Sequence, residues 1–116
     1  MEKLEDVLSV EMLNDILDIE VEEFTGTYIW GGVHLRYKTE LNKEDKVINI
    51  YELAHLTKQK AITKGYFMNV LYNEDWWDRV EKPFEVDLYN HRVRFSADRE
   101  CYAIFKAYKW IYKKEK

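Results

Sequence analysis

The apolar positions in the first forty residues change from helical spacing to alternation. Over residues 4–17 they recur every three or four residues, which predicts a helix, and Ser9 is a good N-cap that predicts a break into two pieces. Over residues 19–40 apolar and polar residues alternate around glycines, which predicts two or three short strands joined by tight turns. The polar segment 41–46 is the best candidate for a boundary after this N-terminal part.

A well-delimited helix is predicted next, followed by a strand. Asn49 is a good N-cap, Glu52 stands at the capping-box position, and Gly65 suits the left-handed residue after the last turn. Residues 66–72 then carry apolar side chains at both odd and even positions, which is typical of a central strand that is buried on both faces. We therefore expect the N-terminal helix to cover the second face of the sheet.

The strongest local pattern is the segment "FEVDLYNHRVRF", residues 84–95. Folded about Tyr89 and Asn90, it has one face that is apolar apart from His91. The other face then places Asp87 opposite Arg92 and Glu85 opposite Arg94, so both arginines are predicted to be neutralised across the strands. Tyr89 is a poor residue for a two-residue turn, and a longer loop shifted by a residue or two is the alternative.

The last helix is predicted to begin near Ser96 as its N-cap. Its apolar residues form one inner stripe: Cys101, Ile104, Phe105, Tyr108 and Ile111. The fold class is therefore α+β, with an α-β-β-β-α unit whose two helices lie on one face of a mostly antiparallel sheet. An N-terminal helix and short extra strands complete a single domain, 1–116. It divides into an N-terminal elaboration, 1–47, a core, 48–112, and a basic tail, 113–116.

Composition narrows the class of protein further. The chain is 47% hydrophobic and 16% aromatic, enough for a real core, and it has a single cysteine. No apolar run approaches the roughly 18 residues of a membrane span. The acidic start lacks the pattern of a secretory signal, which favours the cytoplasm. Residues 1–48 carry a net charge of −7 and residues 49–116 a net charge of +3, which indicates two surfaces of opposite sign or simply two solvated ones.

Residues with catalytic or metal-binding chemistry do not form recognisable motifs. His34, His55 and His91 lie far apart without the spacing of a metal site. Cys101 near a helix start could have a lowered thiol pKa, but its place on the inner stripe favours a small core residue. No nucleophile elbow, phosphate-binding glycine loop or framed carboxylate pair occurs. We expect a protein that is not an enzyme and holds no cofactor or metal.

Adjacent tryptophans suggest a surface for protein binding. In "NEDWWDRVEK", residues 73–82, the neighbours Trp76 and Trp77 cannot easily both be core, so one is expected on an exposed surface. Aromatic residues are enriched at the energetic centres of protein interfaces. The candidate partner-binding residues are Tyr72, Asp75, Trp76, Trp77, Asp78 and Tyr89.

Nucleic-acid binding is the main alternative. The order α-β-β-β-α is also that of the double-stranded-RNA-binding domain. However, "SADRECY" at the start of the last helix is acidic on balance, where such domains carry lysines. The remaining candidate contacts are Lys106, Lys109, Lys113 and Lys114. Nucleic-acid binding needs several unpaired cations on one surface, so this alternative is the weaker one.

Two blocks of the sequence resemble a family. "INIYELAHLTKQKAITKGY" (48–66) and "FSADRECYAIFKAYKWI" (95–111) resemble small uncharacterised phage and prophage proteins related to the phage αβα-sandwich domain. In these proteins an "IYELAHKCKEWA"-like helix precedes a short sheet and an "ADTEPEAIFKACEWI"-like helix closes the chain. The resemblance covers residues 48–112 and departs from the pattern at 99–101, where the usual Thr-Glu-Pro cap is absent. It implies an accessory protein of a mobile element in a bacterial cytoplasm.

Together these observations predict a non-enzymatic phage or prophage protein that binds a host protein, for instance as an inhibitor of a bacterial defence system. The acidic surface of residues 1–48 could engage a basic groove meant for nucleic acid. A nucleic-acid-binding accessory protein is one alternative. A self-associating structural module, with the tryptophan pair buried in a homodimer, is another.

Overall fold

The computed structural model of the chain describes residues 2–29, 31–40, 45–72 and 82–115. These residues form an α+β fold with two three-stranded antiparallel sheets. The helices are α1 (Leu4–Val7), α2 (Val10–Leu17), α3 (Ile50–Thr63) and α4 (Glu100–Lys114). Sheet A contains β1 (Val21–Ile29), β2 (Gly32–Thr39) and β3 (Lys46–Asn49), and sheet B contains β4 (Met68–Tyr72), β5 (Phe84–Leu88) and β6 (Val93–Ala97).

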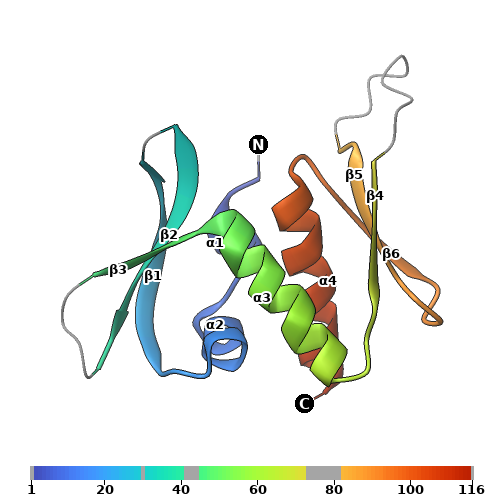
Figure 1. Cartoon of the computed structure of the whole chain (residues 1–116), viewed down its shortest axis with the longest axis horizontal. Helices are drawn as coiled ribbons and strands as arrows, with labels where there is room; N and C mark the ends of the chain where they lie inside the picture. The colour runs from blue at the N-terminus through green and yellow to red at the C-terminus, as the bar shows by residue number, and fades with distance from the viewer. Residues whose placement is uncertain (1, 30, 41–44, 73–81, 116) are drawn as a thin grey trace.

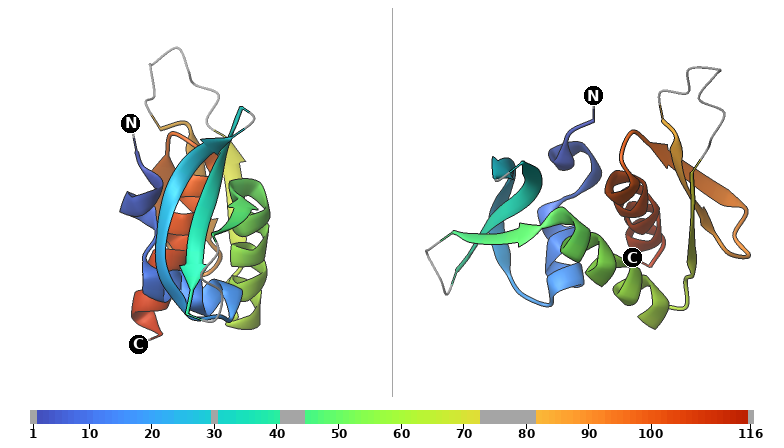
Figure 2. Two further views of the ribbon diagram at one scale, coloured as in Figure 1. Left: turned by 90° about the vertical axis from the view of Figure 1, so that its left-hand side faces the viewer. Right: turned by 45° about the horizontal axis from the view of Figure 1, so that its top comes forward.

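The helices lie between the two sheets, so the molecule has three layers (Figures 1 and 2). Helix α4 packs on all three strands of sheet B and against α1 and α3, and α2 packs on β1 of sheet A. Each sheet therefore has one face toward the helices and one face away from them. The predicted fold class and the order α-β-β-β-α after residue 48 are confirmed.

Local signals placed several helix ends correctly. Ser9 caps α2 by accepting a hydrogen bond from the Met12 amide at 3.2 Å, and it separates α2 from α1 as predicted. Asn49 caps α3 in the same way through the Tyr51 amide at 2.8 Å. Gly65 follows α3 with a φ of 86°, the left-handed conformation that favours glycine. These ends depend on contacts within a few residues, which is why the sequence predicts them.

The start of α4 was wrongly predicted. Ser96 lies inside β6, and the helix begins only at Glu100, after Arg99 in the N-cap position without a side-chain cap. The strand keeps Ser96 because its neighbour Ala97 pairs with Phe84 at the far end of the sheet. The inner stripe of α4 is buried as predicted, and the flanking residues Tyr102, Ala103 and Ala107 are buried as well. Since α4 has sheet B on one side and other helices on the other, burial extends around most of it.

Strand β4 is an edge strand of sheet B, not a central one. Its side chains alternate between half-buried and exposed, and Leu71 is exposed on the outer face. The N-terminal helices do not cover that face, because α1 and α2 lie between the sheets. Both helices of the α-β-β-β-α unit were expected to pack on one face of its sheet. Helix α4 does pack on sheet B, whereas α3 packs on α4 and on β2 and β3 of sheet A.

The β5–β6 hairpin has the predicted faces but a register shifted by two residues. Asp87 pairs with Arg94 and Glu85 with Ser96, so the loop contains four residues, 89–92. The predicted pairing of Asp87 with Arg92 is wrong, and the longer loop is correct. A shift by two keeps every side chain on its own face. The polar connection 41–46 was also predicted too long, since Lys46 already belongs to β3.

None of the helices in the described part of the chain is both long and apolar enough to cross a membrane.

Candidate functional site

The outer face of sheet B carries exposed aromatic side chains next to paired charges. Residue Phe67, just before β4, and Tyr89, just after β5, are 54% and 67% exposed. They are neighbours across the sheet, because the Tyr89 amide donates to the Phe67 carbonyl at 3.0 Å. Leu71 adds a third exposed apolar side chain on β4. Exposed positions are ordinarily occupied by polar residues, and a group of exposed apolar side chains on one face is typical of a binding surface. This group is therefore a candidate contact surface.

Arg94 is neutralised on the same face. Its guanidinium donates to Asp87 through Nε at 2.7 Å and through Nη2 at 3.4 Å, and Nη1 lies 3.4 Å from Glu85. The hydrogen bond and charge of Asp87, together with the charge of Glu85, raise the pKa of Arg94 above its ordinary value. Because the group is already permanently charged at neutral pH, the pairing mainly fixes its orientation.

An open depression of about 650 Å³ lies at the end of this face where the loop between β5 and β6 begins. It is lined by Asn69, Asp87, Leu88, Tyr89, Asn90, Arg92, Val93 and Arg94. Within the described part of the chain, no carboxylate pairs with the exposed Arg92, in contrast to Arg94 beside it. The depression therefore contains one guanidinium group that is available to a ligand.

The loop that carries Arg92 is anchored to the rest of the molecule. The His91 ring packs against Tyr66 and Trp110, with ring centroids 4.9 and 5.8 Å apart. The His91 amide also donates to the Leu88 carbonyl at 3.1 Å and closes the turn. His91 thus serves as a packing residue. Asn90 and Arg92 both have positive φ, at 67° and 54°.

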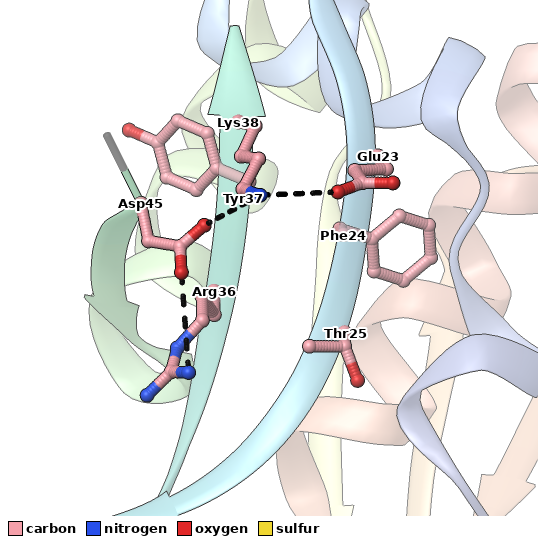
Figure 3. Close-up of a pocket in the computed structure, with 7 residues that line it drawn as sticks. All are labelled: Glu23, Phe24, Thr25, Arg36, Tyr37, Lys38 and Asp45. Carbon is pink, nitrogen blue, oxygen red and sulfur yellow. Dashed lines mark ion pairs between the residues drawn. The ribbon is translucent and has the colours of Figure 1, made fainter. Parts of the chain in front are cut away.

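A second depression, on the outer face of sheet A, has its charges closed into a network (Figure 3). Asp45 lies between Arg36 and Lys38, at 3.9 and 3.8 Å, and Lys38 also lies 3.6 Å from Glu23. These four groups sum to zero charge, and each cation has a carboxylate beside it. Both depressions lie on the outer face of a sheet and are lined by charged and aromatic side chains. Of the two, only the depression on sheet B has a cation without a carboxylate beside it among the described residues.

Comparisons with models of protein families, with curated proteins and with solved structures each found no match. The resemblance to phage and prophage proteins stays a prediction that rests on residues 48–66 and 95–111. These blocks contain α3 and most of α4, which pack against each other between the sheets.

The predicted partner-binding residues are only partly covered by the structure. Tyr89 lies in the exposed group described above. Tyr72 is also exposed, and its ring packs 5.1 Å from that of Phe84. Asp75, Trp76, Trp77 and Asp78 lie outside the described residues, so their prediction stays open. Phe67 and Arg92 were missed, because the sequence indicates neither that the outer face of β4 is open nor that Arg92 falls in the loop.

The four lysines of α4 do not form an equivalent set. The Lys106 amino group contacts Glu2 and lies 2.6 Å from the Ser96 carbonyl, so it is occupied inside the fold. Lys114 lies over the Trp110 ring at 4.6 Å. Lys109 is half-buried and Lys113 exposed. The nucleic-acid alternative therefore loses one of its candidate contacts to an internal ion pair.

Cys101 is a buried thiol. Burial, together with the negative charge of Glu100, raises its pKa to about 11, so it is protonated at neutral pH. The interpretation as a small core residue is favoured over a reactive cysteine. No three metal-ligating side chains come together among the described residues.

The ion pair between Glu2 and Lys106 connects the N-terminal segment to α4, and we expect it to make the stability of the fold sensitive to acid. Burial alone would raise its pKa, but the hydrogen bonds and charges of Lys106 and Lys82 outweigh burial and lower it to about 2 from 4.5. The folded state therefore binds the Glu2 proton less tightly than the unfolded state does. This contribution to stability is complete above pH 4.5 and is lost as the pH falls from 4.5 toward 2.

Replacing Glu2 by glutamine is expected to remove that part of the pH dependence. Urea unfolding between pH 7 and pH 2 should show wild type losing its advantage over Glu2→Gln as the pH falls, with the two curves meeting near pH 2. Glu22→Gln is the control, since Glu22 is exposed and has no ion pair within the described part. A constant difference between wild type and Glu2→Gln at all pH values would contradict the expectation.

Proposed function

We propose that this chain is a small non-catalytic phage or prophage protein that binds a host protein through the outer face of sheet B. The inhibition of a bacterial defence system is the role that we infer for it. The observation that carries the proposal is the exposed group of Phe67, Tyr89 and Leu71 on the outer face of sheet B. On the same face Arg94 is neutralised by carboxylates. Exposed aromatics next to an arginine are typical of the energetic centre of protein interfaces.

Two further features support protein binding over the alternatives. Arg94 on the outer face of sheet B is paired with carboxylates, and Lys106 on α4 is paired with Glu2, so each surface loses a cation that binding driven by counterion release would need. The exposed side chains of Phe67, Leu71 and Tyr89 also lie on one face of sheet B, and such a group favours a contact surface over a fully solvated one. The sequence resemblance supplies the mobile-element context and the bacterial cytoplasm as the site of action.

The test compares two matched double variants in binding assays with host lysate. Phe67→Glu/Tyr89→Glu changes the proposed surface, and Val47→Glu/Tyr51→Glu changes one strand residue and one tyrosine elsewhere. Val47 and Tyr51 are 47% and 68% exposed, close to the values of the residues they match. The first variant is expected to reduce recovery of a stoichiometric partner by about tenfold or more, and the second to leave it unchanged.

Equal recovery with both variants would place the interface elsewhere, and the absence of a stoichiometric partner from several hosts would refute the proposal. Light scattering at two concentrations tests the homodimer alternative directly. If wild type is a dimer and Phe67→Glu/Tyr89→Glu a monomer, this surface joins two copies of the chain and not the chain to a host protein.

A further inference from the structure

We infer that the depression at the loop end of sheet B binds a carboxylate side chain of the partner protein, with Arg92 as the group that recognises it. This inference deepens the proposed function and rests on it. It assigns a partner chemistry: an aspartate or glutamate flanked by an apolar residue that contacts Tyr89. Guanidinium groups present a planar set of donors that matches a carboxylate in two places at once.

The charge of the depression matches a single carboxylate. Its charged lining residues are Asp87, Arg92 and Arg94, which together carry a net charge of +1. Arg94 is held by Asp87 at 2.7 Å and has Glu85, outside the lining, at 3.4 Å, so within the described part of the chain Arg92 is the cation of the lining that has no carboxylate beside it. A phosphate dianion would bring two negative charges to a site that offers one positive charge and would face Asp87 as well. The lining therefore favours a carboxylate over a phosphate group.

The backbone at Arg92 is a second, independent observation. Arg92 adopts a φ of 54°, a conformation in which glycine or asparagine costs less than a residue with a long side chain. Local strain of this kind is found at functional positions, where the side chain is kept despite its conformational cost. A purely structural loop would gain by having glycine here, because the described residues give the Arg92 side chain no partner that holds the fold together.

The surroundings of Arg92 complete a binding site. Asn69 and Asn90 also line the depression and offer amide groups for hydrogen bonds, and the exposed Tyr89 ring supplies an apolar contact. His91, on the same loop, is fixed against Tyr66 and Trp110, so the loop is held before any ligand arrives. A site that is formed in advance loses less entropy on binding.

The experiment titrates the isotope-labelled protein with short blocked peptides and follows the Arg92 Nε–H and Asn90 amide signals by NMR. The probes are N-acetyl-Ala-Glu-Leu-amide, its glutamine analogue and its phosphoserine analogue. The glutamate peptide should bind saturably and about tenfold more tightly than the glutamine peptide, the factor expected for a charge-assisted hydrogen bond. Stronger binding of the phosphoserine peptide would overturn the assignment to carboxylates, and equal binding of all three would overturn the site.

Variants separate recognition from folding. Arg92→Gly should abolish the preference for glutamate without lowering the melting temperature, because glycine relieves the positive φ. Arg92→Lys should recover part of the affinity, since the charge returns without the planar fork. Asp87→Asn should tighten binding because it removes a negative charge from the lining, and Arg36→Gln, in the depression on sheet A, should change nothing. A loss of stability in Arg92→Gly would show that Arg92 has a structural role instead.

The two proposals fail in different ways. If a host partner depends on Phe67 and Tyr89 but not on Arg92, the proposed function stands and the carboxylate site is wrong. If the glutamate peptide binds at Arg92 but no host partner is recovered, the site stands and the proposed function is wrong.

Discussion

Replacing Phe105 by alanine is expected to lower the free energy of unfolding by about 3–5 kcal/mol. Phe105 is 0% exposed and lies on α4, which has sheet B on one side and helices α1 and α3 on the other. Truncating the ring removes buried apolar contacts and leaves a cavity that the surrounding layers can fill only in part. Single domains are stable by about 5–15 kcal/mol, so the variant should lose a large part of its stability.

Urea denaturation followed by circular dichroism measures this loss. The control is Ile62→Ala on α3, where the side chain is 52% exposed and the change should stay within about 0.5 kcal/mol. If Phe105→Ala were as mild as the control, α4 could not be the central helix between two sheets. The layered arrangement itself would then be wrong.

Replacing Asp15 by alanine is expected to cost about 2–3 kcal/mol, the second-largest effect. Asp15 on α2 accepts a hydrogen bond from the Tyr108 hydroxyl on α4 and lies 2.5 Å from the Lys64 amino group, so it joins α2 and α4 to the C-terminal end of α3. Tyr108 is completely buried, and without Asp15 its hydroxyl group loses its hydrogen-bond partner. An unsatisfied buried polar group costs more than a hydrogen bond contributes when it is made.

The contribution of Asp15, Lys64 and Tyr108 to stability also depends on pH. Burial alone would raise the pKa of Asp15, but hydrogen bonds from Lys64 and Tyr108 and the charge of Lys64 lower it below 3.8. Burial and the Asp15 charge raise the pKa of Tyr108, which therefore stays protonated. The stability that Asp15 contributes is thus present above pH 3.8 and declines as the pH falls below it.

Asp18→Asn is the matched control for Asp15→Ala. Asp18 pairs with Lys60 at 2.7 Å, but its side chain is largely exposed, so losing that ion pair should cost no more than about 0.5 kcal/mol. Asparagine also tolerates the positive φ of Asp18. In the double variant Asp15→Ala/Tyr108→Phe, the cost should be smaller than the sum of the two single changes, because no hydroxyl is left without a partner. Additive costs would show that Asp15 and Tyr108 act independently.

Which side chains share a face could be predicted from the sequence. The helical spacing of Cys101, Ile104 and Phe105 placed them together in the core. The alternation over residues 84–95 separated Val86 from Asp87 correctly as well. Capping residues and periodicity act within a turn or between adjacent strands, so the sequence alone is sufficient to specify them.

Strand register shows why the candidate site could not be predicted. A shift by two residues leaves the same faces apolar and still sets acids near arginines, so both registers satisfy the sequence pattern. They differ in one respect that matters for function. In the predicted register Arg92 is paired with Asp87, whereas in the structure Arg94 takes that place and Arg92 is free of any carboxylate in the described part of the chain.

What the sequence determined by itself is the set of local structures: the break at Ser9, the ends of α3, the inner stripe of α4 and the two faces of the hairpin. What only the tertiary structure decided is which faces are covered. The helices lie between two separate sheets and leave the outer face of sheet B uncovered, with Phe67 exposed beside Tyr89. Strand β4 is an edge strand because it pairs only with β5. The physical reason is that periodicity reports which side chains lie together, whereas burial depends on distant segments that pack on that face or leave it open.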